Sequence, residues 1–236
     1  IRDAGLSRGL GDVYKRQRLQ RSEENLKSWI KYRSDIWRYD GAEEPLRRMA
    51  NTNSNLYAYR FDWDEQNNSS FAGNYQLFVG AAHGLEIPFL TGDFDLGPIT
   101  FYIKPFMFPD DSDEGRLALS DLMMTYWANI AKYGNPNEFV KGPKWEKFTQ
   151  ENNQLLILDN PTANLVEMRT IPVSKDDLLS QIEADSALEI KERCLIGWIA
   201  ARNFQEDARP QPPFNFCSNF TEEDLYKLRN LTEGRD

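Results

Sequence analysis

The chain has 236 residues, enough for one large domain with a substantial core, and its hydrophobic (40%) and charged (28%) fractions are ordinary for a globular protein. The net charge is −9, and no Lys/Arg-rich stripe interrupts the acidic background, so we expect no binding to nucleic acid. No apolar run has the length of a membrane span, and a single histidine without a Cys-x-x-Cys pair predicts neither a zinc site nor any other cofactor.

The segment from Ile1 to Gln17 is unlike the rest of the sequence. It has no apolar periodicity, and it resembles the translation of a transposase-type sequencing-library adapter, with Ser7 to Gln17 matching the constant transposon end. We therefore predict that residues 1–17 are not native and that the authentic sequence begins near Arg18, inside a longer gene. The N-terminus then carries no information on export, which leaves a periplasmic, secreted or cytoplasmic location open.

One pattern in this segment is expected to be a false match. Gly5-Leu6-Ser7-Arg8-Gly9 fits the G-x-S-x-G nucleophile elbow, which presents a serine on a tight turn between a strand and a helix. Only four residues precede Gly5, too few to form that strand. We therefore do not expect Ser7 to be catalytic.

Two helices are predicted next. Leu26 to Tyr39 is expected to be helical, with Ser34-Asp35 capping a fresh turn before Ile36. Pro45 suits the first residue of a short helix that runs to about Met49, because its fixed φ fits that position.

A strand and a glycine-rich loop should follow the turn at residues 51–55. The aromatic run from Leu56 to Trp63 predicts a strand. A polar loop from Gln66 to Ser70 then leads to the stretch from Phe78 to Gly84, which contains the only histidine, His83.

The helix prediction for residues 116–133 rests on apolar residues spaced three and four apart: Leu119, Leu122, Met123, Tyr126, Trp127 and Ile130. Gly134 and Asn135-Pro136 should end it. Apolar runs at 155–158 and 164–168, on either side of Asn160-Pro161, predict a terminal hairpin.

The last part is expected to hold one helix and a tail. Leu178 to Ala201 has a helical pattern, and the Pro-rich run from Pro210 to Pro213 leads into a polar tail, which we take as residues 204–236. Cys194 and Cys217 fit either a disulfide in an exported protein or two free thiols. Altogether the elements favour an α/β or mixed architecture.

The stretch Gly80-Ala81-Ala82-His83-Gly84-Leu85-Glu86-Ile87-Pro88-Phe89 resembles the type-B carboxylesterase and cholinesterase family of α/β-hydrolases. The likeness continues at 57–61, at 126–137, at 145–159 and at Arg193-Cys194. It implies that residues 18–203 are the C-terminal portion of an α/β-hydrolase domain, with terminal strands of the central sheet, packing helices and an N-terminal part missing. An uncovered parallel-sheet edge would then predict poor solubility or a loosely packed state.

The resemblance implies that His83 is the catalytic histidine of a serine esterase. In this family the triad follows the chain order serine, acid, histidine, and the histidine moves the proton of the serine hydroxyl. A histidine with only a structural role is the alternative at this position. Glu86 is expected to be structural, Asp93 and Asp95 to be loop residues, and Ser34-Asp35 resembles a supporting pair of the family or a simple helix cap.

The implied activity is hydrolysis of small carboxylic esters through an acyl-enzyme. The family's nucleophile and triad acid would lie upstream of Arg18, so we expect this chain alone to be inactive. Two alternatives remain: a family member that has lost the nucleophile and binds a partner, and an unrelated acidic interaction domain. The sequence does not reveal ester specificity or oligomeric state.

Overall fold

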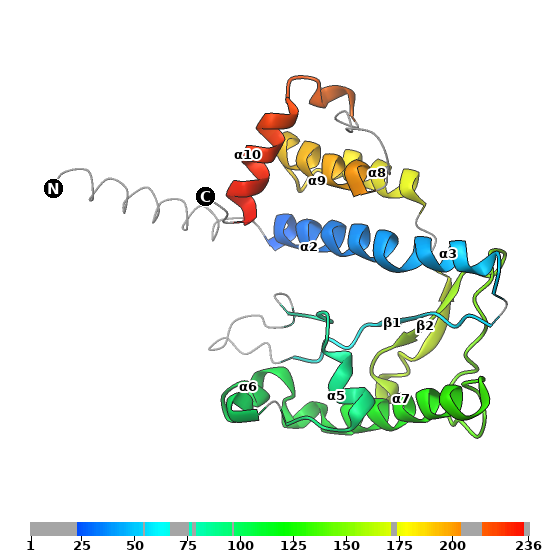
Figure 1. Ribbon diagram of the computed structural model, residues 1–236. Helices are drawn as coiled ribbons and strands as arrows, with labels where there is room; N and C mark the ends of the chain where they lie inside the picture. The colour runs from blue at the N-terminus through cyan, green and yellow to red at the C-terminus, as the bar shows by residue number, and fades with distance from the viewer. Residues whose placement is uncertain are drawn as a thin grey trace. The chain divides into compact units, whose positions relative to one another are not determined.

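The computed structural model describes residues 23–53, 55–66, 76, 79–95, 97–170, 174–203 and 214–233 (Figure 1). The chain divides into two compact units, which are described separately. Unit 1 comprises residues 1–44 and 173–236, and unit 2 comprises residues 45–172. The predicted false elbow at Gly5 to Gly9, like the whole segment 1–17, lies outside the described residues. No helix among the described residues is both long enough and apolar enough to cross a membrane.

Helices make up the described part of unit 1. They are α2 (Glu23–Arg38), the π-helix η1 (Tyr39–Glu43), α8 (Lys175–Ala184), α9 (Ile190–Asn203), the 3-10 turn η5 (Asn215–Cys217) and α10 (Glu222–Glu233). Their core contains Trp29 and Ile36 of α2, Leu195 and Trp198 of α9, and Leu225 of α10. A disulfide between Cys194 and Cys217 links α9 to η5, with 5.6 Å between the two Cα atoms. The open choice between a disulfide and free thiols is thus resolved.

Three expectations for unit 1 need correction. The helix α2 runs without a break through Ser34-Asp35, because Asp35 pairs along the helix with Lys31 and Arg38 instead of capping a new turn. The predicted helix 178–201 is two helices, and Asp185 stops the first by accepting the backbone N–H of Ala187 (2.8 Å). The predicted polar tail holds η5 and α10 within residues 214–233, while residues 204–213 lie outside the described part.

Unit 2 is built on a small mixed sheet (Figure 1). Its strands are β1 (Tyr59–Phe61), β2 (Gln154–Leu158) and β3 (Glu167–Thr170), in the order β1-β2-β3. β1 runs parallel to β2, with Tyr59 opposite Leu156, and β2 runs antiparallel to β3. The hairpin predicted around Asn160-Pro161 is confirmed, with the 3-10 turn η4 (Pro161–Ala163) at its tip.

The remaining elements of unit 2 are helical: α3 (Glu44–Ala50), where the chain passes from one unit to the other, α5 (Glu86–Thr91), the 3-10 turn η2 (Gly97–Ile99), α6 (Thr100–Met107), the 3-10 turn η3 (Asp110–Ser112) and α7 (Asp113–Tyr133). α7 confirms the predicted helix, and Gly134 ends it in a left-handed conformation (φ 68°). Pro45 is the second residue of α3.

The core of unit 2 lies where α7 packs against the sheet. Leu119, Met123 and Tyr126 of α7 share one buried cluster with Leu156 and Leu158 of β2. Trp145 joins this cluster and donates from its indole nitrogen to the carbonyl of Ala58 (2.9 Å). The strand predicted from Leu56 to Trp63 is shorter than expected, because only residues 59–61 form the parallel ladder with β2. The mixed α/β architecture is confirmed, although helices dominate it.

Candidate functional site

His83 lies in a turn of unit 2 between β1 and α5, and its side chain is exposed. The backbone N–H of Leu85 donates to the carbonyl of Ala82 (3.2 Å), which closes the turn, and α5 begins one residue later at Glu86. The imidazole therefore lies in a turn just before α5, near the end of the connection of residues 62–85 between two secondary-structure elements. This is a typical location for a residue that meets a substrate or another catalytic group.

Two glycines shape the turn. Gly80 has φ +52° and Gly84 has φ +88°, both in the left-handed region that costs other residues about 1–2 kcal/mol. A Cβ on Gly80 would also lie 3.2 Å from the carbonyl oxygen of Gln76, whereas a Cβ on Gly84 would meet no atom within 4 Å. The backbone on both sides of His83 thus depends on glycine for its conformation.

A buried glutamine holds the upstream end of the loop. Gln66, five residues after β1, is 4% exposed, and its Nε2 donates to the carbonyl of Gly80 (2.9 Å). Its Oε1 is buried and has no hydrogen-bond partner in the described part of the chain. This contact was not foreseen from the sequence, because a glutamine at the start of a polar loop gives no sign of burial.

An aromatic cluster holds the downstream end. Phe89 of α5 is fully buried, and its ring centroid lies 5.2 Å from that of Phe61 and 5.2 Å from that of Trp63. The hydroxyl of Ser120 in α7 donates to the carbonyl of Phe89 (2.8 Å). The downstream end of the loop that carries His83 is therefore fixed, through Phe89, to the strand β1 and to the helix α7.

The neighbours of His83 in the sequence have separate contacts. Burial and, secondarily, the charge of Glu86 raise the pKa of Tyr59, which places Glu86 near the strand β1. Asp93 and Asp95 are loop residues, as predicted: Asp95 accepts from the backbone of Gly97 (2.8 Å) and the hydroxyl of Thr100 (2.8 Å). Asp93 in turn accepts from the backbone of Asp95 (2.9 Å).

Four carboxylates gather where β1 and β2 end. Burial raises the pKa of Asp159 to about 6, with smaller contributions from the charges of Asp64, Asp62 and Glu65 and against the lowering effect of the hydrogen bond from the backbone of Asn160. Parallel strands end at the same edge of a sheet, so these residues could have been brought together from the predicted strands. The cluster does not by itself identify a ligand. No group of three His, Cys, Asp or Glu residues able to hold a metal ion occurs among the described residues.

Comparison with known proteins shows to which family the chain is similar. A model of the carboxylesterase family matches residues 2–175. This range begins inside the segment 1–17, and the boundary at Arg18 stays a prediction. Acetylcholinesterase from Gallus gallus is 32% identical over 103 residues, which is 44% of this chain and 11% of that protein.

Neuroligin-3 from Macaca mulatta is 40% identical over 68 residues, 29% of this chain and 30% of that protein. Neuroligin-3 from Homo sapiens is also 40% identical over 68 residues, which is 7% of its length. The matched regions therefore span 30% or less of these relatives.

Proposed function

Because the chain belongs to the carboxylesterase family, we propose that His83 is the general base and acid of a serine carboxylesterase whose nucleophile and triad acid come from sequence upstream of Arg18. The family membership confirms the resemblance found at residues 80–89. On this proposal, β1, β2 and α7 belong to the terminal part of an α/β-hydrolase sheet and its covering helices.

One observation supports this role above the others. The only histidine of the chain stands exposed on a loop whose ends are held by Gln66 and Phe89. A catalytic base has to be held in a fixed position and still be reachable by the groups that exchange protons with it.

The proposed reaction has two halves. In the first, the imidazole of His83 takes the proton from the serine hydroxyl while the serine oxygen attacks the ester carbonyl, and it then gives this proton to the departing alcohol. In the second, His83 takes a proton from water, whose oxygen attacks the acyl-enzyme, and returns it to the serine as the carboxylic acid leaves. A histidine suits both halves because its unperturbed pKa of about 6.5 lies close to neutral pH.

The test begins with the source DNA. Sequencing across the Gln17–Arg18 junction should show that the adapter-like segment is absent from the native gene. The upstream reading frame should encode a predicted strand, a G-x-S-x-G motif and a helix, followed by a triad acid. In the completed protein, His83→Gln should lower kcat/KM for p-nitrophenyl butyrate by at least about 10³-fold. The matched control is Asp121→Asn, an exposed residue of α7, which should leave the activity unchanged.

Two outcomes would overturn the proposal. An upstream elbow without serine would favour the alternative of a non-enzymatic, partner-binding member of the family. Full activity of the His83→Gln protein would show that this histidine is not the base. The chain as given should not hydrolyse the ester above the buffer rate, and His83-dependent turnover by this chain alone would contradict the inferred position of the nucleophile.

A further inference from the structure

A cavity lies within unit 1. It has a volume of about 250 Å³ and is lined by residues of three helices: Arg33, Ile36 and Trp37 of α2, Ile199 and Arg202 of α9, and Arg229 of α10. None of these residues belongs to the unit that carries His83. The cavity therefore requires an explanation of its own.

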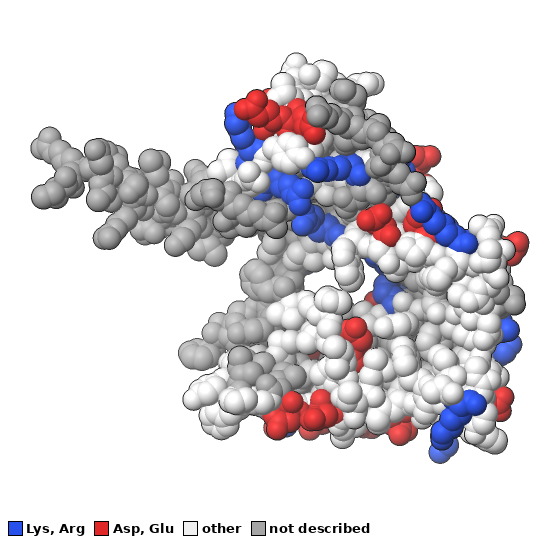
Figure 2. Space-filling model, viewed as in Figure 1, with Lys and Arg blue, Asp and Glu red and all other residues white. Residues whose placement is uncertain are grey.

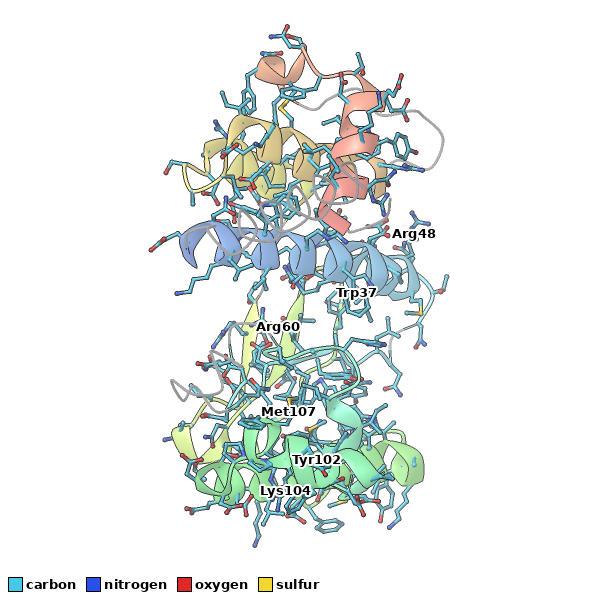
Figure 3. All side chains as sticks on the ribbon, turned by 90° about the vertical axis from the view of Figure 1, so that its left-hand side faces the viewer. Trp37, Arg48, Arg60, Tyr102, Lys104 and Met107 are labelled. Atoms are coloured by element: carbon cyan, nitrogen blue, oxygen red, sulfur yellow. A yellow bond between two sulfur atoms is a disulfide. The ribbon has the colours of Figure 1, made fainter. Side chains whose placement is uncertain are left out.

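Two isoleucines and a tryptophan form the apolar part of the cavity lining. Ile36 is 2% exposed and Ile199 is 7% exposed, and both belong to the core of unit 1. Trp37, four residues after Arg33, is 64% exposed and projects from α2 (Figure 3). The exposed indole offers a face on which a flat, apolar group can pack.

The charged wall is built around Arg202. Its Nη1 donates to the hydroxyl of Tyr226, and its guanidinium carbon lies 5.4 Å from the ring centroid of Trp198 and 5.1 Å from that of Tyr226. These contacts orient the guanidinium without neutralising it, because the rings and the hydroxyl carry no charge at neutral pH. Within the described residues, no carboxylate forms an ion pair with Arg202.

Arg33 and Arg229 add two more guanidinium groups at the same cavity. In Figure 2, basic side chains gather over the helices of unit 1, next to the acidic first turn of α10, although the chain as a whole has a net charge of −9. A guanidinium fork matches the two oxygens of a carboxylate, so several arginines around an apolar wall favour a ligand with one anionic and one apolar end.

We propose that this cavity binds a small aromatic carboxylate. The carboxylate oxygens accept hydrogen bonds from Arg202 and a neighbouring arginine, and the ring packs against Trp37, Ile36 and Ile199. The volume suits such a ligand, because cavities for drug-sized molecules usually exceed about 300 Å³. The proposal does not depend on the role of His83, since the two sites share no residue.

The test is titration calorimetry of the full chain with sodium 2-naphthoate at low ionic strength. Saturable binding to one site is expected, and 2-naphthalenemethanol, which lacks the charge, and acetate, which lacks the ring, should each bind at least about tenfold more weakly. Arg202→Gln should weaken naphthoate binding about tenfold or more, and Arg202→Lys by a smaller factor. The matched control is Lys227→Gln on α10, whose charge pairs with Glu223 and does not line the cavity.

Three results would overturn the proposal: no saturation with naphthoate at millimolar concentrations, equal binding of the uncharged alcohol, or unchanged binding by Arg202→Gln. Far-UV circular dichroism and an intact Cys194–Cys217 bond would show that each variant is folded. Arg33→Gln provides a second variant on another helix, where the exposed side chain lines the same cavity. Its affinity should also fall, because Arg33 lines the same cavity.

Discussion

The two units differ in the contacts that stabilise each of them internally. In unit 2, packing between aromatic rings connects distant segments: Trp145 has its ring centroid 5.8 Å from Tyr57, 5.4 Å from Tyr126 and 5.3 Å from Trp127. In unit 1, a disulfide and hydrogen bonds to a buried carboxylate connect the helices. The disulfide joins α9 to η5, and the buried carboxylate of Glu192 in α9 accepts from Asn25 (2.7 Å) and Trp29 (3.0 Å) of α2.

This difference bears on what each unit tolerates. Ring packing is spread over many contacts, so unit 2 should lose stability in proportion to the buried volume that a substitution removes. A disulfide and a buried carboxylate are single links, so unit 1 should respond sharply when one of them is broken. The unit that carries the His83 loop should therefore be sensitive to the loss of buried volume, and the unit that holds the arginine-lined cavity to the loss of a single link.

The largest effect is expected from Leu156→Ala in unit 2. Leu156 is fully buried at the centre of β2 and is paired with both Tyr59 and Met168, so its truncation should cost about 3 kcal/mol or more of unfolding free energy. Hydrogen exchange should speed up in β1, β2 and α7 while the amides of unit 1 keep their protection. Leu165→Ala, at a position 39% exposed, should change little. Equal loss of protection in both units would show that they unfold together.

The corresponding change in unit 1 is loss of the disulfide. Cys194 and Cys217 are 23 residues apart, so the double substitution to alanine should cost about 3 kcal/mol through the larger entropy of the unfolded chain. Exchange should then speed up in α9 and α10 but not in the sheet. Reduction of the unmodified chain should reproduce the effect, and a reductant that accelerates exchange in unit 2 as well would contradict the separation of the two units.

Some of these features could be predicted from the sequence and others could not. The helix α7 was predictable because its apolar face repeats every three or four residues and a glycine follows its last turn. The interruption at residues 185–189 was not, because leucine and isoleucine continue at helical spacing on both sides of Asp185. Sequence cannot separate one long helix from two short ones when a polar side chain ends the first by bonding a nearby amide.

The candidate site shows the same limit. The position of His83 in a loop followed from the surrounding glycines and from the family resemblance. The support from Gln66 did not, because it depends on a contact between residues 14 apart in sequence. The disulfide also stayed open, because whether two cysteines meet depends on how α9 and η5 pack. Long-range polar and covalent contacts are thus the part that local sequence patterns missed.

A smaller effect is expected at the turn of His83. Gly84→Ala places a Cβ on a residue at φ +88°, which should cost about 1–2 kcal/mol. The strain should appear in the His83 loop, so in the completed protein kcat should fall more than KM rises. Gly41→Ala is the control, because its Cβ would meet no atom within 4 Å and its φ is not in the left-handed region. Equal effects of the two substitutions would argue against a strained catalytic turn.

The smallest effect concerns pH and the carboxylates at the end of the sheet. Burial raises the pKa of Asp159 to about 6, above its value in the unfolded chain, so the folded state holds this proton more tightly. The stabilisation is complete below about pH 4 and is lost as the pH rises through about 6. Asp159→Asn removes the charge and keeps an oxygen for the backbone N–H of Asn160, which now donates to Asp159 over 2.7 Å.

This variant should therefore melt at a higher temperature than the unmodified chain at pH 7.5 and at nearly the same temperature at pH 4.5. The gain should stay below about 1 kcal/mol, because the carboxyl is only half buried and water screens the neighbouring charges. Asp121→Asn, exposed on α7, should show no such dependence on pH. An equal stabilisation at both pH values would mean that packing around residue 159, rather than the charge of Asp159, limits the stability at this edge of the sheet. Polar contacts at this edge would then contribute little to the stability of unit 2, in contrast to the buried carboxylate of unit 1.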